Sequence, residues 1–373
     1  MLAFSIKSHL QKSLDTVLPI LKTAHEISPE FIHNCSPGIN TFAKLLSNSA
    51  SRFIEPMALR AKQITEARFG KIMGLYAPIY LSNECLNDCV YCGFRKSNNF
   101  PRTTLSLNEI KKEADILCER GLRHVLLVAG EHTEKCSADF ICEVAKILHT
   151  RIPSLSIEVA PFSVEQYKKV LEAGVEGVTV YQETYNEKHY RELHPRGKKR
   201  DYNWRLETPD RAAEAGIRRI NLGVLLGLSK DWKKDSLSTA IHLDYLMKKY
   251  WRTKFAVSVP RMCPAKTSFQ PAVVVSDKEI VQLILAYRIA FPDLGISLST
   301  REPLKLRDGL CGLAITHLSA ASSTEPGGYS QPSSEKEGKQ FIISDERSVD
   351  DIKQMLINRG LEPVYKDWDF CLN

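Results

Sequence analysis

The chain has 373 residues, of which 43% are hydrophobic and 25% are charged, and its formal net charge is +7. These values are typical of a globular protein, and the length suits one large α/β domain. The charge is a mild bias over this length, which argues against nucleic acid as a partner. No apolar stretch reaches the roughly 18 residues of a membrane span, and residues 1–21 lack a signal-peptide pattern. We therefore expect a cytoplasmic protein that contacts no membrane.

Residues 1–70 are expected to form an N-terminal helical extension that packs on the rest of the chain. The prediction depends on apolar residues at helical spacing, which include Leu10, Leu14, Val17, Leu18 and Leu21. No shift in composition marks this region as a separate domain.

From about residue 76 a short apolar run and an amphipathic helix alternate repeatedly. The runs are rich in Val, Ile and Leu without strict alternation, which is typical of parallel strands buried on both faces. They lie at residues 77–81, 124–128, 156–160, 177–181, 220–226, 255–259, 295–298 and 314–318. Eight such units over residues 71–320 predict a (β/α)8 barrel of the TIM type. A doubly wound open sheet is the alternative, since the number of strands does not exclude it.

Start and stop signals support the helices between these runs. Ser106 with Glu109, and Ser276 with Glu279, are predicted capping boxes. Thr208 is predicted as an N-cap that places a proline at the first helical position. Glycines at 121, 174 and 216 are predicted to end helices. The basic run at 197–200 (GKKR) is expected to be a solvated loop or a local anion contact.

Residues 321–373 are expected to form a loop and a helix packed on the barrel. The segment 320–348 is rich in Ser, Pro, Gly and charge, which predicts either a mobile lid or a poorly ordered surface loop. Within it, residues 327–329 (GGY) are a candidate for an ordered stretch. A final helix is predicted at 349–358, followed by the tail 366–369 (KDWD).

Three of the ten cysteines are crowded into one short segment, as Cys85, Cys89 and Cys92. The other seven are scattered, and we interpret them as small buried hydrophobic residues. Zinc sites usually pair two C-x2-C elements, and ferredoxin clusters use four cysteines. Three thiolates would leave one iron of a [4Fe–4S] cluster open to a small molecule. The alternatives are a zinc site completed by a distant histidine, an electron carrier, and thiols without a ligand.

The spacing C-x3-C-x2-C, with the aromatic Tyr91 before the last cysteine, resembles the signature of the radical S-adenosylmethionine (radical SAM) superfamily. The motif also follows the first predicted strand, where the superfamily carries it. The resemblance implies that the open iron binds the amino and carboxylate groups of S-adenosylmethionine. One electron from the cluster then releases a 5′-deoxyadenosyl radical, which removes a hydrogen atom from the substrate.

Further positions are implied to hold S-adenosylmethionine. Ala129, Gly130 and Glu131 end the second predicted strand and resemble the Gly-Gly-Glu-like motif of the superfamily, with alanine in place of the commonest first glycine. Leu225 lies in a segment (221–228) that resembles the adenine-side segment of the superfamily but lacks its usual trailing glutamate. These residues, together with Tyr91, are expected to contact the cofactor.

Polar residues at other strand ends complete the predicted site. Glu183 is expected at the ribose, and Arg205 at the methionine carboxylate, because a guanidinium forms forked hydrogen bonds; a surface helix arginine is the alternative for Arg205. Ser299 and Arg301 follow the seventh strand and suit a substrate carboxylate; a rim ion pair between Arg301 and Glu302 is the alternative. Catalytic roles are therefore predicted for Arg301, Ser299, Glu183 and Tyr185.

Several segments together resemble the 2-iminoacetate synthase family, the tyrosine lyases of thiamine biosynthesis. They are 80–83, 85–94, 128–132, 181–185, 205–211, 299–302, 326–329 and 366–369. The resemblance implies cleavage of the Cα–Cβ bond of L-tyrosine to 2-iminoacetate and p-cresol, with 5′-deoxyadenosine and methionine as further products. It also implies two partners, thiazole synthase and a flavodoxin- or ferredoxin-type electron donor.

Two related lyases are the alternatives within the superfamily. The tyrosine lyase of hydrogenase maturation carries a second cysteine cluster near its C-terminus, whereas this sequence has only Cys371 there. The tryptophan lyase of thiopeptide pathways shares the barrel and the carboxylate grip. Four residues are candidates for proton transfer at the substrate, and the sequence does not rank them: His132, Glu183, Tyr185 and His317.

Overall fold

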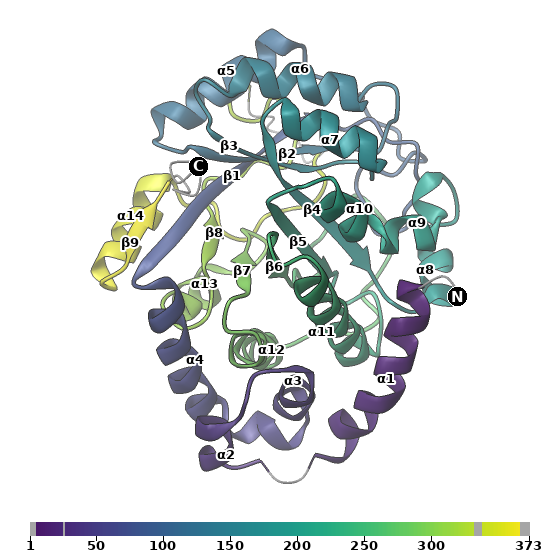
Figure 1. The fold of residues 1–373 in the computed structure, drawn as a ribbon. Coiled ribbons are helices and arrows are strands. Elements are labelled where there is room, and N and C mark those ends of the chain that lie inside the picture. The colour runs from purple at the N-terminus through teal and green to yellow at the C-terminus, as the bar shows by residue number, and fades with distance from the viewer. Residues whose placement is uncertain (1–4, 25–26, 332–337, 366–373) are drawn as a thin grey trace.

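The computed structural model describes residues 5–24, 27–331 and 338–365. Eight parallel strands close into a barrel, because β1 pairs with β8 on one side and with β2 on the other (Figure 1). Their bounds are β1 Ile72–Ser82, β2 His124–Ala129, β3 Ser154–Glu158, β4 Val175–Glu183, β5 Arg219–Val224, β6 Lys254–Ser258, β7 Gly295–Leu298 and β8 His317–Ser319. The predicted (β/α)8 barrel is thus confirmed, and a doubly wound open sheet is wrong.

Each predicted apolar run overlaps one of these strands, with ends shifted by a few residues. The largest shift at an N-terminal end is in β1, which begins at Ile72 rather than at residue 77. A ninth strand, β9 (Glu362–Val364), was not predicted and pairs in parallel with the start of β1. It is short and half-exposed, so it lacks the apolar run that identifies a buried strand.

The helices that connect the strands along the chain lie around the outside of the barrel (Figure 1). They are α5 Leu107–Glu119, α6 Ala138–Leu148, α7 Val164–Glu172, α8 Glu187–Leu193, α9 Tyr202–Leu206, α10 Thr208–Glu214, α11 Trp232–Lys249, α12 Asp277–Ala290 and α13 Leu304–Leu310, with a short 3-10 turn at Lys198–Arg200. Within the described residues, no helix combines the length and hydropathy that a membrane crossing needs.

The capping signals are confirmed at most positions. Ser106 and Ser276 each form a capping box with the glutamate three residues later. The glycines at 121, 174 and 216 have φ angles of 87°, 109° and 93°, the left-handed backbone that ends a helix. The prediction for Thr208 is wrong by one position: α10 begins at Thr208 and its N-cap is Glu207. Thr208 donates its hydroxyl to the Trp204 carbonyl of α9 instead, at 3.0 Å.

The N-terminal helices pack beside α11 and α12 on the outer side of the barrel (Figure 1). They are α1 Ile6–Thr23, α2 Pro29–Asn34, α3 Ile39–Leu46, a 3-10 turn at Ser49–Arg52, and α4 Ile54–Phe69. The amide of Gln282, buried on α12, donates to the carbonyls of Leu45 and Ser47 at 2.8 and 2.9 Å. The rings of Phe42 and Tyr287 are 4.6 Å apart. These contacts join α3 to the barrel's outer layer through one continuous core.

The described parts of segment 320–348 lie against the barrel mouth. Tyr329 donates its hydroxyl to the Pro78 carbonyl of β1 at 2.7 Å, so the ordered stretch predicted at 327–329 is confirmed. Ser344 donates its backbone N–H to the Thr300 carbonyl at 2.8 Å. Helix α14, at Val349–Asn358 as predicted, follows this segment. The predicted tail 366–369 and Cys371 lie outside the described residues.

Candidate active site

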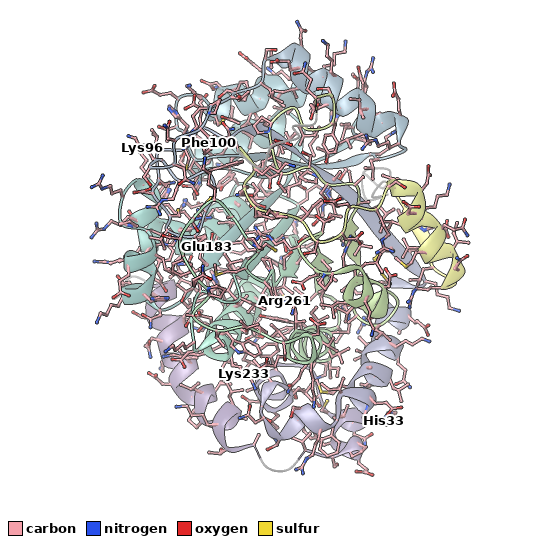
Figure 2. All side chains as sticks on the ribbon, turned by 180° about the vertical axis from the view of Figure 1, so that it is seen from behind. His33, Lys96, Phe100, Glu183, Lys233 and Arg261 are labelled. Atoms are coloured by element: carbon pink, nitrogen blue, oxygen red, sulfur yellow. The ribbon has the colours of Figure 1, made fainter. Side chains whose placement is uncertain are left out.

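A cavity opens at the carboxyl ends of the barrel strands, where (β/α)8 enzymes carry their active sites. Every strand supplies lining residues, either directly or through the loop that follows it. Figure 2 shows Glu183 toward the middle of the molecule, whereas Lys96 lies near its edge. The predicted site residues that line the cavity are Cys85, Cys89, Tyr91, Cys92, Ala129, Gly130, Glu131, Glu183, Arg205, Leu225, Ser299 and Arg301.

The three crowded cysteines line one cavity, and polar groups lie near their sulfur atoms. Burial raises the pKa of Cys85 to about 11, and it also raises the pKa values of Cys89 and Cys92. Backbone N–H groups oppose this effect at Cys85 and Cys92, and the Lys199 cation opposes it at Cys89. Sulfur atoms that face N–H donors and a cation suit iron–sulfur ligation.

A single-ion site fits this geometry less well than a cluster. Among the residues that the structure describes, no three Cys, His, Asp or Glu side chains are arranged to hold one metal ion. Zinc needs such convergence on one point. In a cluster each thiolate binds a different iron, so the three cysteines need only line the same cavity, as they do here.

Two glycines let other segments approach the cysteine loop closely. A Cβ added at Gly130 would lie 2.3 Å from the Glu84 carbonyl oxygen, and one at Gly93 would lie 2.5 Å from the Lys339 carbonyl oxygen. Neither distance is compatible with a side chain, because the obstacles are backbone atoms. Because Gly130 has no side chain, the end of β2 can lie beside the cysteine loop. Because Gly93 has none, segment 338–341 can lie against the same loop.

Glu131 and Arg205 form a buried pair at one wall of the cavity. Arg205 Nη1 lies 2.7 Å from Glu131 Oε1, and its Nε donates to the Tyr181 carbonyl at 2.6 Å. Asn87 donates its side-chain amide to the other oxygen of Glu131 at 2.9 Å. Arg205 is 6% exposed, so the alternative of a surface helix arginine is wrong. The pair joins the end of β2, the cysteine loop and α9 in one polar network.

Glu183 occupies an unusual backbone conformation at the end of β4. Its φ is 69°, a left-handed value that non-glycine residues adopt mainly at turns and functional sites. Its carboxylate accepts from Lys199 Nζ at 2.7 Å, and both side chains are about nine-tenths buried. Burial acts to raise the pKa of Glu183, but the Lys199 and Arg205 cations outweigh it and hold the pKa below its ordinary value. Lys199 is thus the member of the 197–200 run that makes an anion contact, while its neighbours are exposed.

Tyr91 is held by a neutral histidine behind the cysteine loop. Burial lowers the pKa of His194 to about 3, so the ring carries one proton at neutral pH. His194 Nδ1 lies 2.6 Å from the Tyr190 carbonyl, which only accepts, so Nδ1 donates there. Nε2 therefore accepts from the Tyr91 hydroxyl at 2.8 Å. This bond fixes the aromatic residue of the motif at the cavity wall.

Arg301 and Ser299 line the opposite part of the cavity, after β7. The guanidinium carbon of Arg301 lies 3.3 Å from the centre of the Phe341 ring. The alternative of a rim ion pair between Arg301 and Glu302 is wrong, because Glu302 is buried and pairs with Arg261. Stacking on Phe341 holds the guanidinium plane, which leaves its N–H groups directed to other partners.

The structure does not bring Tyr185 to the cavity. Its hydroxyl lies 3.0 Å from His242 Nδ1 of α11, and its backbone N–H donates to Asp235 at 2.8 Å. The turn at Glu183 redirects the chain, so Tyr185 packs against α11 outside the barrel mouth. Of the four candidates for proton transfer, only Glu183 lines the cavity.

Several lining residues were missed in the sequence analysis, among them Lys199, Asn87, Glu158 and Phe341. Glu158 is the last residue of β3, and strand ends are where barrel enzymes place polar groups. That signal could have identified Glu158, since the predicted run 156–160 contains it. Lys199 lies in a short 3-10 turn and Phe341 in a loop, and no local pattern places such residues in a distant site.

Comparisons with known proteins agree with this geometry. The model of the radical SAM superfamily matches residues 79–239, and that of the biotin and thiamin synthesis associated domain matches residues 258–362. The chain is 44% identical to the 2-iminoacetate synthases of Salmonella typhimurium and of Escherichia coli, over 88% of this chain and 86% of each relative. The solved structure of the FeFe-hydrogenase maturase HydG from Carboxydothermus hydrogenoformans is 32% identical, with a TM-score of 0.89 over 98% of this chain and 86% of that one.

The match to the superfamily model and the identity to the two synthases together identify the family of this chain. The matched superfamily segment contains the three cysteines and the first five barrel strands except the start of β1. The high identity to the two synthases extends over most of the barrel and beyond it. The chain therefore belongs to the 2-iminoacetate synthase family of the radical SAM superfamily.

Proposed function

We propose that this chain is a radical SAM lyase that cleaves the Cα–Cβ bond of L-tyrosine to 2-iminoacetate and p-cresol. The observation that carries the proposal is a single cavity lined by the three motif cysteines and also by Arg301 and Ser299. A cluster ligand set and a carboxylate grip in one cavity bring cofactor and amino acid together. The similarity to two 2-iminoacetate synthases supports tyrosine as that amino acid.

Membership of the superfamily implies a [4Fe–4S] cluster and S-adenosylmethionine, and we propose which residues hold them. Cys85, Cys89 and Cys92 would bind three irons of the cluster. When bound, cluster and cofactor supply the radical that removes a hydrogen atom from the substrate. The residues around the cysteine loop fit the cofactor, because they offer charged groups of both signs and apolar walls; they are Ala129, Gly130, Glu131, Glu183, Arg205, Leu225 and the backbone near Tyr91.

The remaining residues bind and orient the substrate. Arg301, held by stacking on Phe341, would form a forked pair with the tyrosine carboxylate. Ser299 would add a hydroxyl donor to the same group. Segment 338–341 lies over the cysteine loop, with the Gln340 carbonyl accepting from the Gly93 N–H at 3.2 Å. This cover would exclude water from the cavity during the reaction.

One anaerobic assay tests the proposal. Protein with a reconstituted cluster is mixed with S-adenosylmethionine, dithionite and L-tyrosine, and the products are separated by liquid chromatography with mass detection. We expect equal amounts of 5′-deoxyadenosine and p-cresol, with glyoxylate from hydrolysed 2-iminoacetate and without cyanide. Cyanide would instead indicate the chemistry of hydrogenase maturation. Deoxyadenosine without p-cresol would overturn tyrosine as the substrate, and tryptophan would then be tested.

We further propose the partners and the division of the chain. Thiazole synthase would receive 2-iminoacetate, and a flavodoxin- or ferredoxin-type protein would reduce the cluster. In this scheme residues 71–320 form the catalytic barrel, residues 1–70 support it from outside, and residues 321–373 contribute its cover. Co-purification of thiazole synthase with the tagged chain, with and without tyrosine, would test the first partner.

A further inference from the structure

Glu158 is a second charged group in the substrate part of the cavity that the proposed mechanism does not use. It ends β3, and its side chain lines the cavity. In the closed ring of eight strands, β3 and β7 lie four strands apart, so Glu158 and Arg301 reach the cavity from strand ends on opposite sides of the barrel. Burial raises the pKa of this carboxyl to about 7, and the Arg301 cation is the strongest opposing influence.

The surroundings of Glu158 leave its carboxyl group directed at the cavity. In the described part of the chain, the structure shows no hydrogen bond or ion pair to its side-chain oxygens. The charged groups that act on it are Arg301, Glu183, Lys199 and Arg205, and the tyrosines that its charge affects are Tyr76, Tyr80 and Tyr181. Glu158 is partly exposed to the cavity, and a carboxylate that is largely removed from water is stabilised when a partner supplies a cation. A ligand with a cationic group would supply that partner.

An amino acid carries both groups that this cavity complements. Its carboxylate matches Arg301, and its ammonium matches a carboxylate across the cavity. We propose that Glu158 binds the α-ammonium group of the substrate and accepts a proton from it. The inference rests on the proposed function, because it takes L-tyrosine as the ligand.

The proton transfer balances without any further reactant. An N–H bond of the ammonium breaks, its electron pair stays on nitrogen, and the proton moves to a carboxylate oxygen of Glu158. The substrate then has a neutral amine, whose lone pair is available when the neighbouring Cα–Cβ bond breaks. Glu158 in its charged form is required for this transfer, so both binding and turnover should strengthen as pH rises from 6 to 8.

The test compares Glu158→Gln with the wild type, each with reconstituted cluster and S-adenosylmethionine but without reductant. Glutamine keeps the shape of the side chain and removes its charge. Calorimetry measures the binding of three ligands: L-tyrosine, L-phenylalanine, which lacks the hydroxyl, and 3-(4-hydroxyphenyl)propanoate, which lacks the amino group. Glu172→Gln is the matched control, because Glu172 is exposed on the outer helix α7 of the same unit.

At pH 8 we expect Glu158→Gln to bind tyrosine and phenylalanine about 10-fold or more weakly, with no change for the propanoate. The rise in affinity between pH 6 and 8 should disappear, and p-cresol formation at saturating tyrosine should fall by about 100-fold or more. Unchanged binding and pH dependence of tyrosine would overturn the inference. A loss for tyrosine and the propanoate but not for phenylalanine would assign Glu158 to the phenol instead. If wild-type protein makes no p-cresol at all, the proposed function itself fails.

Discussion

The buried pair between Lys199 and Glu183 offers a quantitative test of the site's electrostatics. Replacing Lys199 by methionine keeps most of the aliphatic side chain and removes the cation that lies 2.7 Å from Glu183 Oε1. The side chains are 11% and 9% exposed, so water compensates little for the lost partner. Breaking a buried pair by removing one member typically costs about 3–5 kcal/mol. Because Arg205 also acts on Glu183, we expect a loss near about 2–4 kcal/mol in the free energy of unfolding.

The pH dependence of this loss follows from the direction of the pKa shift. In the wild type the pKa of folded Glu183 is below its ordinary value, so its contribution to stability is present above about pH 4.3 and is lost as pH falls through the lowered pKa. Without Lys199, burial raises the pKa of folded Glu183, and the charged form destabilises the fold. The difference between wild type and Lys199→Met should therefore be larger at pH 7.5 than at pH 5.

Urea unfolding of metal-free protein, followed by circular dichroism at both pH values, measures the effect. Glu183→Gln and the double variant complete a cycle, in which we expect the double variant to be more stable than Lys199→Met because no charge is left unpaired. Lys248→Met is the matched control, since Lys248 is exposed and pairs with Asp244 one turn away; about 0.5 kcal/mol or less is expected there. A loss below about 1 kcal/mol for Lys199→Met, equal at both pH values, would refute the reasoning.

Three further outcomes are expected. Cys92→Ala should abolish the cluster absorption near 400 nm after reconstitution and all turnover, whereas Cys142→Ala, a control thiol outside the cavity, should retain both; full absorption in Cys92→Ala would contradict the ligand assignment. Arg301→Ala should weaken tyrosine binding by about 1.5–3 kcal/mol without changing S-adenosylmethionine binding, as measured by calorimetry; the reverse pattern would place Arg301 at the cofactor. Gly130→Ala should lower the free energy of unfolding, measured in urea, by about 1–3 kcal/mol, because its Cβ would meet the Glu84 carbonyl. An unchanged urea midpoint would mean that the cysteine loop can shift to admit the Cβ without loss of stability.

The sequence was informative wherever a signal is local. Strand runs, capping boxes and terminating glycines each depend on residues within one turn or one strand, so the eight barrel strands and most helix starts were predicted correctly. The cysteine motif was equally local, because its residues share one loop. The strand-end rule placed most of the remaining candidates, since the carboxyl ends of parallel strands all meet at the barrel mouth.

The sequence did not predict features that depend on the direction of a side chain or on contact between distant segments. Tyr185 follows a predicted strand as closely as Glu183 does, yet the left-handed turn at Glu183 sends it toward His242. The segment near Gln340 has the composition of an unstructured loop, but it lies against the cysteine loop because Gly93 leaves room for its backbone.

By itself, then, the sequence determined the barrel, the three-cysteine motif and the family resemblance, because each is encoded in short periodic patterns or in one contiguous segment. Only the tertiary structure decided that Lys199 pairs with Glu183 and that Glu158 and Arg301 line the same cavity. The physical reason is closure of the barrel. Closure brings residues from the end of every strand to the same cavity. The protonation of each ionisable side chain there then depends on neighbours that are distant in the chain.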